Sequence, residues 1–420
     1  MDEAQAPRFE LEPVSEAGRK FTDLCEQHVA TFADRAAGYD RDGSFATENV
    51  EDLQASGVMR ATLPPKYGGL GVASVLDLTA GINRIARGDA STAIAATMHL
   101  NAVWGLARQW QRANEAGDDA TMSLYDTAFQ LLGAGALICG AGTEPGTHML
   151  YPLTEASRTD GGWLLSGRKT FVTLSPAAAA FNVLCQVQRP DGTKWTAAAL
   201  VLRETEGLEL KENWDGLGMR ASGSHELSLS ECFVPEEMLT EIGPWGQWTS
   251  AYLVGASAGN AALVGAFLGI AETAHDYAVK MLRTRRKAPS GRLLAERPEL
   301  QHAIGQMEID LSSSRAVLER SCRLWDDYLA RTDPDLYTLE PAHQLMKEFQ
   351  CAKTFVNKRA IEIVDTAMTL SGGSGYVASS LLARLYRDVR SGPFMQPFSP
   401  NEAFEYIGKV ALGLSPDVDI

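Results

Sequence analysis

Three stretches in the middle of the chain decide its fold. They are Thr143-Glu144-Pro145-Gly146, then Gly167-Arg168-Lys169-Thr170-Phe171-Val172-Thr173, then Leu217-Gly218-Met219-Arg220-Ala221-Ser222-Gly223-Ser224-His225. Apolar residues alternate across 181–187, which is the period of a half-buried strand, and the Asp-Gly pairs at 160–161 and 191–192 suit hairpin turns. We therefore expect an antiparallel β domain at residues 138–243.

The sequence on either side of this segment has the helical period. Apolar residues fall at steps of three and four in 263–281 and again in 356–370, as the buried stripe of a helix does. Such long stripes fit a bundle whose faces are buried against one another or against another subunit. The predicted class is an α+β multidomain protein, with an N-terminal helical domain (1–137), the central antiparallel β domain (138–243) and a C-terminal helical bundle (244–420).

Composition limits the class of partner. The 420 residues carry a formal net charge of −15, which argues against a nucleic-acid binder and against a partner of anionic membranes, because phosphate binding needs a basic surface. The N-terminus is acidic, unlike a signal peptide, and no apolar run approaches the length of a transmembrane span. Six cysteines lie far apart without the spacing of metal ligands, so we expect buried free thiols, no metal and a cytoplasmic location.

The order of helices, β domain and helices, together with five motifs, resembles the acyl-CoA dehydrogenase superfamily over about residues 21–413. Besides the three stretches above, residues 64–71 (Pro-Pro-Lys-Tyr-Gly-Gly-Leu-Gly) resemble that family's PxxYGGxG loop. Gly372-Gly373-Ser374-Gly375-Tyr376, followed by Tyr386-Arg387-Asp388, resembles its GGxGY and RD segments. The resemblance implies a flavin-dependent oxidoreductase that binds FAD as a homodimer or homotetramer.

By this resemblance, Thr143, Phe171 and Thr173 contact the flavin. An isoalloxazine ring needs hydrogen-bonding groups along its polar edge and flat apolar contacts on its faces, and threonine and phenylalanine provide these. Taken alone, Phe171 and Thr173 would indicate only a strand with one buried and one exposed face. The ordered set of motifs favours the flavin site.

A second set of cofactor residues is implied in the C-terminal half. The glycines Gly372 and Gly373 allow backbone N–H groups to approach a phosphate, and in the family this loop contacts the flavin of a neighbouring subunit. The glutamine usual just before it is Thr369 here. Arg286 is the expected partner of the flavin pyrophosphate, although cations there would also complement a helix C-terminus. Gln301 resembles the family's glutamine on the adenosine side.

Two departures from the family pattern affect the chemistry. The run that follows Thr143-Glu144-Pro145 lacks the serine that is usual in the family. It contains His148, which is either a group at the mouth of the site or an exposed loop histidine. The glutamate that removes the substrate α-proton in typical dehydrogenases is expected nine residues after Arg387, where this chain has Gln396. Glutamine cannot accept a proton as a carboxylate does.

Two residues could replace the missing base. Some relatives place it on the helix at 263–281, near Val279 in this chain, and the nearest titratable residues there include His275. Glu402 could enter the site if the prolines on either side of Phe398 shift the local register. Its alternative role is that of a first-turn carboxylate on the final helix.

Three functions remain open from the sequence. The first is α,β-dehydrogenation of an acyl-CoA or carrier-bound acyl thioester, with an electron-transfer flavoprotein as a partner. The second is a flavin-dependent monooxygenase of the same fold, supplied by a flavin reductase, which needs no α-proton base and so fits Gln396 better. The third is a catalytically silent subunit of a hetero-oligomeric acyl-CoA dehydrogenase.

Overall fold

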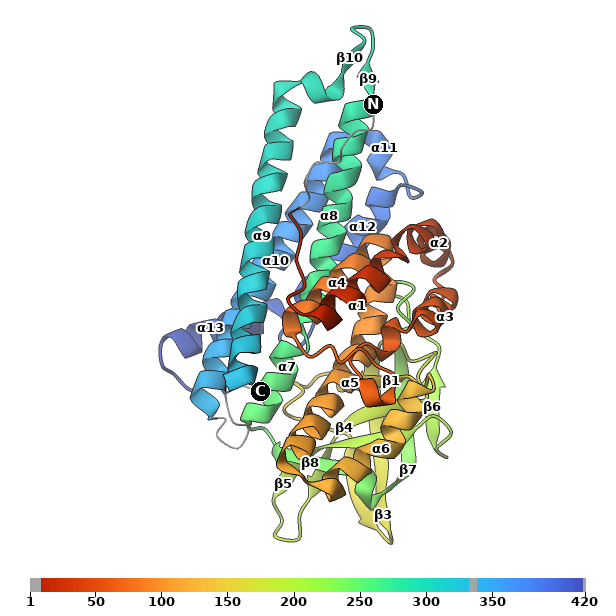
Figure 1. The fold of residues 1–420 in the computed structure, drawn as a ribbon, viewed down its shortest axis with the longest axis vertical. Coiled ribbons are helices and arrows are strands. Elements are labelled where there is room, and N and C mark those ends of the chain that lie inside the picture. The colour runs from red at the N-terminus through yellow and green to blue at the C-terminus, as the bar shows by residue number, and fades with distance from the viewer. Residues whose placement is uncertain (1–8, 332–337, 418–420) are drawn as a thin grey trace.

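The computed structural model describes residues 9–331 and 338–417. The molecule is elongated, with a helical bundle at one end, a β domain at the other and the N-terminal helices beside the junction (Figure 1). The N-terminal helices are α1 (Glu16–Glu26), α2 (Val29–Asp42), α3 (Thr47–Ser56), α4 (Val75–Gly88), α5 (Ala90–Ala116) and α6 (Asp119–Gly133). Asp89 begins α5 by accepting a hydrogen bond from the Thr92 backbone N–H, at 3.0 Å.

The β domain follows α6 and is built on one sheet. Its strands are β1 (Ile138–Ala141), β2 (Glu155–Thr159), β3 (Gly162–Val172), β4 (Ala180–Gln188), β5 (Lys194–Leu202), β6 (Leu208–Lys211), β7 (His225–Pro235) and β8 (Leu239–Pro244). The two Asp-Gly pairs join β2 to β3 and β4 to β5, and both glycines have positive φ, as predicted for hairpin turns.

The sheet differs from the expected purely antiparallel one. Its strand order is β6-β7-β3-β2-β4-β5-β8, and β1 pairs with β4 outside this path. Both β1 and β2 run parallel to β4, while the other pairs of this sheet are antiparallel. β1 and β2 pair with successive parts of the same edge of β4, and the segment that connects them carries Thr143.

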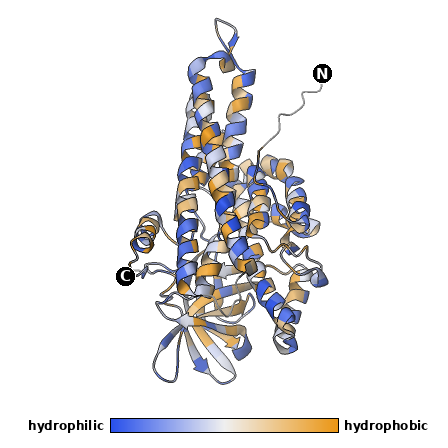
Figure 2. Ribbon diagram, turned by 60° about the vertical axis from the view of Figure 1, so that its left-hand side comes forward, coloured by the Kyte–Doolittle hydropathy of each residue, from blue (hydrophilic) through white to orange (hydrophobic). Residues whose placement is uncertain are grey.

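The C-terminal bundle continues from the β domain through α7. Its elements are α7 (Ser250–Ala258), α8 (Ala261–Thr284), the hairpin β9 (Arg286–Lys287) and β10 (Arg292–Leu293), α9 (Pro298–Arg331), α10 (Leu339–Ser371), α11 (Gly373–Tyr376), α12 (Leu381–Val389) and α13 (Pro400–Ala411). Hydrophobic and hydrophilic residues alternate along the long bundle helices (Figure 2), and the hydrophobic ones supply the core between α8, α9 and α10.

The helical stretch 250–284 corrects one expectation from the sequence. By length and composition it is apolar enough to cross a membrane, and 94% of its most apolar window is buried within the protein. The physical reason is its position, since α8 packs against α4, α9 and α10 and must be apolar on most sides.

The cysteine expectation needs a smaller correction. Five cysteines are free and buried, as predicted, but Cys351 is exposed on α10. Within the described residues, no group of histidine, cysteine and acidic side chains could hold a metal ion.

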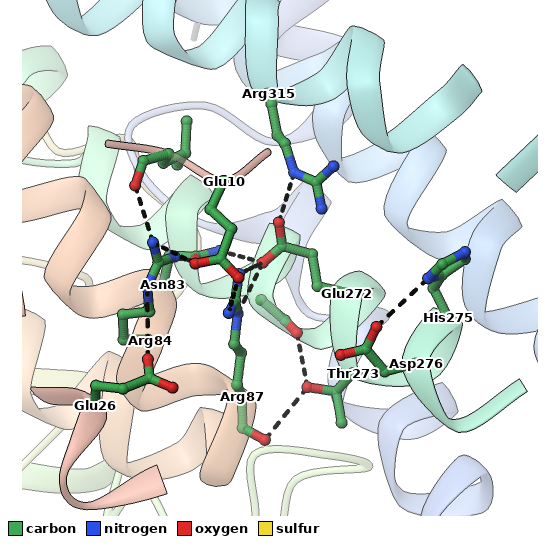
Figure 3. Close-up of polar contacts among 12 residues, drawn as sticks. Glu10, Glu26, Asn83, Arg84, Arg87, Glu272, Thr273, His275, Asp276 and Arg315 are labelled. Atoms are coloured by element: carbon green, nitrogen blue, oxygen red, sulfur yellow. Dashed lines mark hydrogen bonds and ion pairs between the residues drawn. The ribbon is translucent and has the colours of Figure 1, made fainter. Parts of the chain in front are cut away.

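A buried ion-pair cluster joins the N-terminal helices to the bundle (Figure 3). Glu272 of α8 accepts hydrogen bonds from Arg87 of α4 at 2.8 Å and from Arg315 of α9 at 2.8 Å. Glu10 pairs with both Arg84 and Arg87 at 2.7 Å, which fastens the segment before α1 to α4. The arginines hold the pKa of Glu272 below its usual value although burial acts to raise it.

Candidate functional site

The three motif stretches form one surface of the β domain. The Thr170 backbone N–H donates to the Thr143 carbonyl at 2.9 Å, which joins the first stretch to the second. The Thr173 hydroxyl lies 2.8 Å from the Ser224 hydroxyl, which joins the second stretch to the third. Residues as far apart as Thr143 and Ser224 are thereby held together.

A buried ion pair anchors the first stretch. Glu144 accepts hydrogen bonds from the Thr154 N–H at 2.9 Å and the Thr154 hydroxyl at 2.6 Å, and it pairs with the Lys169 ammonium. Lys169 also donates to the Leu184 carbonyl. Burial raises the Glu144 pKa and Lys169 lowers it, with a net pKa below the usual value. The pair fixes the backbone on which Thr143 stands.

Phe171 is held out of the core in a strained conformation. Its φ is +55°, in the left-handed region that a bulky residue rarely adopts, and its ring is 61% exposed. The pairing of β3 with β7 shifts register between Lys169 and Val172, which accounts for the outward turn. Trp214 packs edge-on against the ring, with centroids 5.9 Å apart. A fixed, exposed aromatic ring beside hydroxyl groups fits a flat ring such as an isoalloxazine.

The RD segment of α12 locks the third stretch in place. Asp388 accepts a hydrogen bond from the Met219 N–H at 2.7 Å, and Arg387 donates to the Leu217 carbonyl at 3.2 Å. A side chain at Gly218 would collide with the Arg387 backbone. Burial raises the pKa of the Asp388 carboxyl to about 7. The bundle therefore sets the position of the loop that carries Met219.

Gln396 lies directly against the first stretch. Its Nε2 donates to the Thr143 Oγ1 at 3.0 Å. The residue belongs to a turn at 395–398, which we call the Gln396 turn. The amide thus stands beside a residue that the resemblance assigns to the flavin.

Glu402 has the alternative role that the sequence suggested, that of a first-turn carboxylate on the final helix. Its carboxylate accepts from the Ser399 backbone N–H at 2.6 Å, in a capping box that begins α13. A carboxylate in this role satisfies the helix terminus, and its prediction as a base has no support in this contact.

His275 lies on α8 within the bundle. Its Nε2 is 3.1 Å from Glu308 of α9, and its Nδ1 is 3.6 Å from Asp276 (Figure 3). The contacts of His275 lie within α8 and α9, and they do not bring it to Thr143 or Gln396. Its role as a base stays a prediction that the geometry does not favour.

His148 is a half-buried residue that packs beside the Gln396 turn. Its ring stacks on Phe398, with centroids 5.6 Å apart and planes 20° apart, and it meets Trp248 edge-on. Burial lowers its pKa. Of the two interpretations from the sequence, the position near the site describes this contact better than an exposed loop histidine.

The second set of predicted cofactor residues lies at the opposite end of the molecule. The hairpin β9–β10 and α11 are at the end of the bundle away from the β domain (Figure 1). Arg286 donates to the Gly291 carbonyl within the hairpin at 2.8 Å, and Gln301 donates to the Ala295 carbonyl at 2.8 Å. One chain therefore does not bring this set to Thr143, and a shared site would need a second copy.

The glycine loop at this end has the geometry that glycine permits. Thr369 accepts the Gly372 N–H at its carbonyl, at 3.2 Å, near the end of α10. Gly372 has φ +61° and ψ −152°, a combination essentially restricted to glycine, and Gly373 then begins α11. The neighbouring Ser374 hydroxyl accepts from Arg285 at 2.8 Å. The glycine loop therefore lies next to the arginine-rich segment at the end of α8.

Two residues near the site were missed by reasoning from the sequence. Trp214, which supports Phe171, lies three residues before the third stretch and could have been noticed as an aromatic next to a motif. Lys353 of α10 supports the Gln396 turn, as described below. It gave no signal, because a lysine on a helix is expected at the surface.

The fold and the flavin-type surface define a class of protein, the flavoprotein oxidoreductases with a β domain between two helical regions. The acyl-CoA dehydrogenase N-terminal, middle and C-terminal domain models match residues 15–113, 139–232 and 261–394. The chain belongs to the acyl-CoA dehydrogenase family. It is a flavin-dependent oxidoreductase of that fold.

The chain is also similar to individual proteins with a named activity. The chain is 34% identical to the amino sugar nitrososynthase RubN8 of Streptomyces rubradiris, over 99% of this chain and 96% of that protein. It is 35% identical to the L-evernosamine nitrososynthase of a Micromonospora species, over 97% and 93%. The crystal structure of KijD3 with FMN and dTDP-3-amino-2,3,6-trideoxy-4-keto-3-methyl-D-glucose matches with a TM-score of 0.87 and 34% identity, over 97% of this chain and 96% of that one.

Proposed function

We propose that this protein is a flavin-dependent monooxygenase that oxidises the amino group of a nucleotide-linked amino sugar. The similarity to two nitrososynthases extends over nearly the whole chain, and KijD3 binds FMN together with such a sugar. This is the second of the three functions that the sequence left open, with the substrate class now specified. Dehydrogenation of an acyl thioester is the alternative that the experiment below must exclude.

The observation that carries the proposal is the contact of Gln396 with Thr143. The dehydrogenase reaction needs a carboxylate base, which typical family members carry at the position that Gln396 occupies, and an amide cannot remove an α-proton. The Gln396 amide donates to Thr143 Oγ1 at 3.0 Å, so it is already engaged as a donor. Glu402 is engaged at the start of α13. The geometry therefore suits a reaction without a carboxylate base.

The oxidation can be written with all atoms and electrons balanced. A primary amine, O2, two electrons and two protons give a hydroxylamine and water. A second oxygenation with the same inputs gives water and a dihydroxylated nitrogen, which loses a further water to leave the nitroso group. The reduced flavin supplies the electrons and activates O2. A flavin reductase would have to regenerate it, as expected from the sequence for this function.

The chain's own residues would hold and orient the reactants. Thr143 and Thr173 would offer hydroxyl groups to the polar edge of the flavin, and Phe171 would pack against the ring system. The ion pair of Glu144 with Lys169 keeps the Thr143 backbone fixed. Preorganisation of this kind positions the amine against the flavin without a proton-accepting carboxylate.

FMN is the flavin that we propose, instead of the FAD expected from the sequence. The KijD3 complex contains FMN. Binding of FAD would need the residues near Gly372 and Arg286 of a second copy to reach the adenosine side. The homo-oligomer expected from the sequence stays a prediction.

The test uses purified protein, FMN, a flavin reductase and a dTDP-linked 3-amino sugar. We expect formation of an oxidised sugar, and none when a 3-hydroxy sugar replaces the amine. A separate anaerobic sample is mixed with a panel of acyl-CoA thioesters. Bleaching of the flavin by an acyl-CoA, with no oxidation of the amino sugar, would contradict the proposal.

A further inference from the structure

We propose that Lys353 is a positioning residue for the reaction, because its ammonium holds the Gln396 turn in place from within the bundle. This inference rests on the proposed function, since it concerns the same site. The residue lies on α10, outside the motifs that the family resemblance identifies. Its role would be to act through the turn, without touching flavin or substrate.

The contacts of Lys353 lead directly to both ends of the turn. Its Nζ donates to the Phe398 carbonyl at 2.6 Å and to the Met395 carbonyl. Between these two residues lies Gln396, whose amide reaches Thr143. A single buried ammonium therefore binds two backbone carbonyls of the turn that carries Gln396, the residue at the position of the family's base.

The same turn is supported on its apolar side. The Phe398 ring packs against His148 and against Tyr406, with centroids 5.6 Å and 4.8 Å apart. The Tyr406 hydroxyl lies 2.6 Å from His343 Nδ1. These contacts hold the ring, whereas the backbone carbonyls on either side of Gln396 depend on Lys353. The lysine thus adds polar contacts to the support of the turn.

The environment of Lys353 is unusual for a charged group. The residue is only 2% exposed, and no carboxylate within residues 9–331 and 338–417 lies at ion-pair distance from it. The charge that acts on it from a neighbouring element is the Glu402 carboxylate at the start of α13. Burial lowers the pKa of the amine to about 7. Burial of an amine without a carboxylate at ion-pair distance is costly, so its contacts with the two carbonyls call for a reason other than stability.

A purely structural role predicts different results from a positioning role. If Lys353 only fills space and satisfies carbonyls, its loss lowers thermal stability but leaves turnover of the folded protein unchanged. If it positions the Gln396 turn, its loss lowers kcat with little change in KM for the sugar. The effect should also depend on Gln396, because both residues act through one turn.

The test variant is Lys353→Met, which keeps an unbranched side chain that is one atom shorter and removes its donors. The matched control is Lys358→Met, an exposed lysine on the same helix. We expect kcat to fall about tenfold or more in the first variant and to change less than about twofold in the control. We expect the double variant of Lys353→Met with Gln396→Ala to be no slower than the slower single variant. Additive losses, or unchanged kcat in folded Lys353→Met protein, would overturn the proposal.

FMN binding provides a readout that does not depend on the proposed reaction. Quenching of flavin fluorescence gives the FMN affinity of each variant across pH 6 to 9, a range chosen about one to two units around neutrality. In the wild type we expect affinity to weaken as the pH rises through about 7, because a neutral amine bonds the two carbonyls less strongly than the charged ammonium does. In Lys353→Met we expect weaker binding without this pH dependence. Matching pH profiles would overturn the role of Lys353 even if the amino sugar is not a substrate.

A second variant covers the case in which Lys353→Met does not fold. Lys353→Gln retains an N–H donor without the charge, so it should restore part of the FMN affinity and kcat. Unchanged behaviour of Lys353→Gln relative to the wild type across the pH range would show that the charge has no role. If the wild type binds FMN but oxidises no amino sugar, the proposed function fails and the lysine is still judged by the binding data.

Discussion

Two buried lysines on opposite sides of the Thr143–Gln396 contact are held in different ways. Lys169 lies under the first stretch of the β domain, is fully buried and pairs with Glu144. Lys353 lies under the Gln396 turn, is 2% exposed and contacts backbone carbonyls. The two regions meet where the Gln396 amide donates to Thr143. The β-domain side of the site is held by Lys169, whose charge is paired with that of Glu144. The bundle side is held by Lys353, which has no such partner at ion-pair distance among the described residues.

This difference between the two lysines indicates which part of the site responds to pH. Burial lowers the pKa of Lys169, but the Glu144 carboxylate opposes that shift. The pKa of Lys353 falls to about 7, since only the Glu402 field opposes burial. In the pair each charge opposes the effect of burial on its partner, whereas the single buried amine has a pKa of about 7 and can lose its proton near neutrality.

The largest expected effect is on the β-domain side. Lys169→Met leaves the Glu144 carboxylate buried without its partner, which should cost about 3–5 kcal/mol of unfolding free energy. Denaturant unfolding measures this change. Lys211→Met, at an exposed position of β6, is the control. Adding Glu144→Gln to Lys169→Met should recover part of the lost unfolding free energy. A loss below about 1 kcal/mol in Lys169→Met alone would mean that the Lys169–Glu144 pair does not stabilise the first stretch.

The next effect is the pH dependence of stability on the bundle side. Because the folded pKa of Lys353 is lowered, the unfolded chain binds more protons between about pH 7 and its ordinary pKa. The contribution of this group to stability therefore rises with pH across that window, by up to about 1.4 kcal/mol per pH unit. The difference in unfolding free energy between wild type and Lys353→Met, measured at pH 7 and pH 9, should show this slope. A constant difference would refute the single-charge description.

A smaller effect concerns the contact between the two sides. Gln396→Ala removes one hydrogen bond to Thr143 and should lower the unfolding free energy by about 0.5–1.5 kcal/mol. Thermal or denaturant unfolding at neutral pH measures it, with Gln344→Ala on α10 as a control. A loss as large as that of Lys169→Met would mean that the contact, and not the buried pair, holds the two sides together.

The smallest effect on stability is expected at the exposed ring. Phe171 is 61% exposed and strained, so Phe171→Ala should change the unfolding free energy by less than about 0.5 kcal/mol. Its FMN affinity should nevertheless fall, because the ring is proposed to pack against the flavin. Phe233→Ala, another exposed phenylalanine of the β domain, is the control. Wild-type FMN affinity in Phe171→Ala would contradict this placement of the flavin.

The sequence predicted the features that depend on local patterns and on ordered motifs. The helix–β–helix architecture, both hairpins and the family followed from these. The two parallel pairs with β4 did not, because pairing of distant strands leaves no local pattern. The exposure of Phe171 depends on a register shift between β3 and β7, which alternation along one strand cannot reveal.

The cofactor residues expected from the motifs stay predictions, and the residues that support them gave less signal in the sequence. Gln396 was found by counting from Arg387, but its contact with Thr143 joins residues 253 positions apart. Lys353 could not be found, because burial of a lysine is decided by the packing of α10 against the Gln396 turn and α13. The apolar stretch 250–284 was underestimated for the same reason, since its burial depends on neighbours that are distant in the chain.

Isotope labelling tests the proposed reaction most directly. The wild-type protein, FMN, a flavin reductase and a dTDP-linked 3-amino sugar are incubated under 18O2, and the sugar product is analysed by mass spectrometry. The proposal predicts one 18O atom on the sugar nitrogen of the nitroso product. A product without 18O, or an unchanged amino sugar with a flavin that is reduced anaerobically by an acyl-CoA, would contradict it.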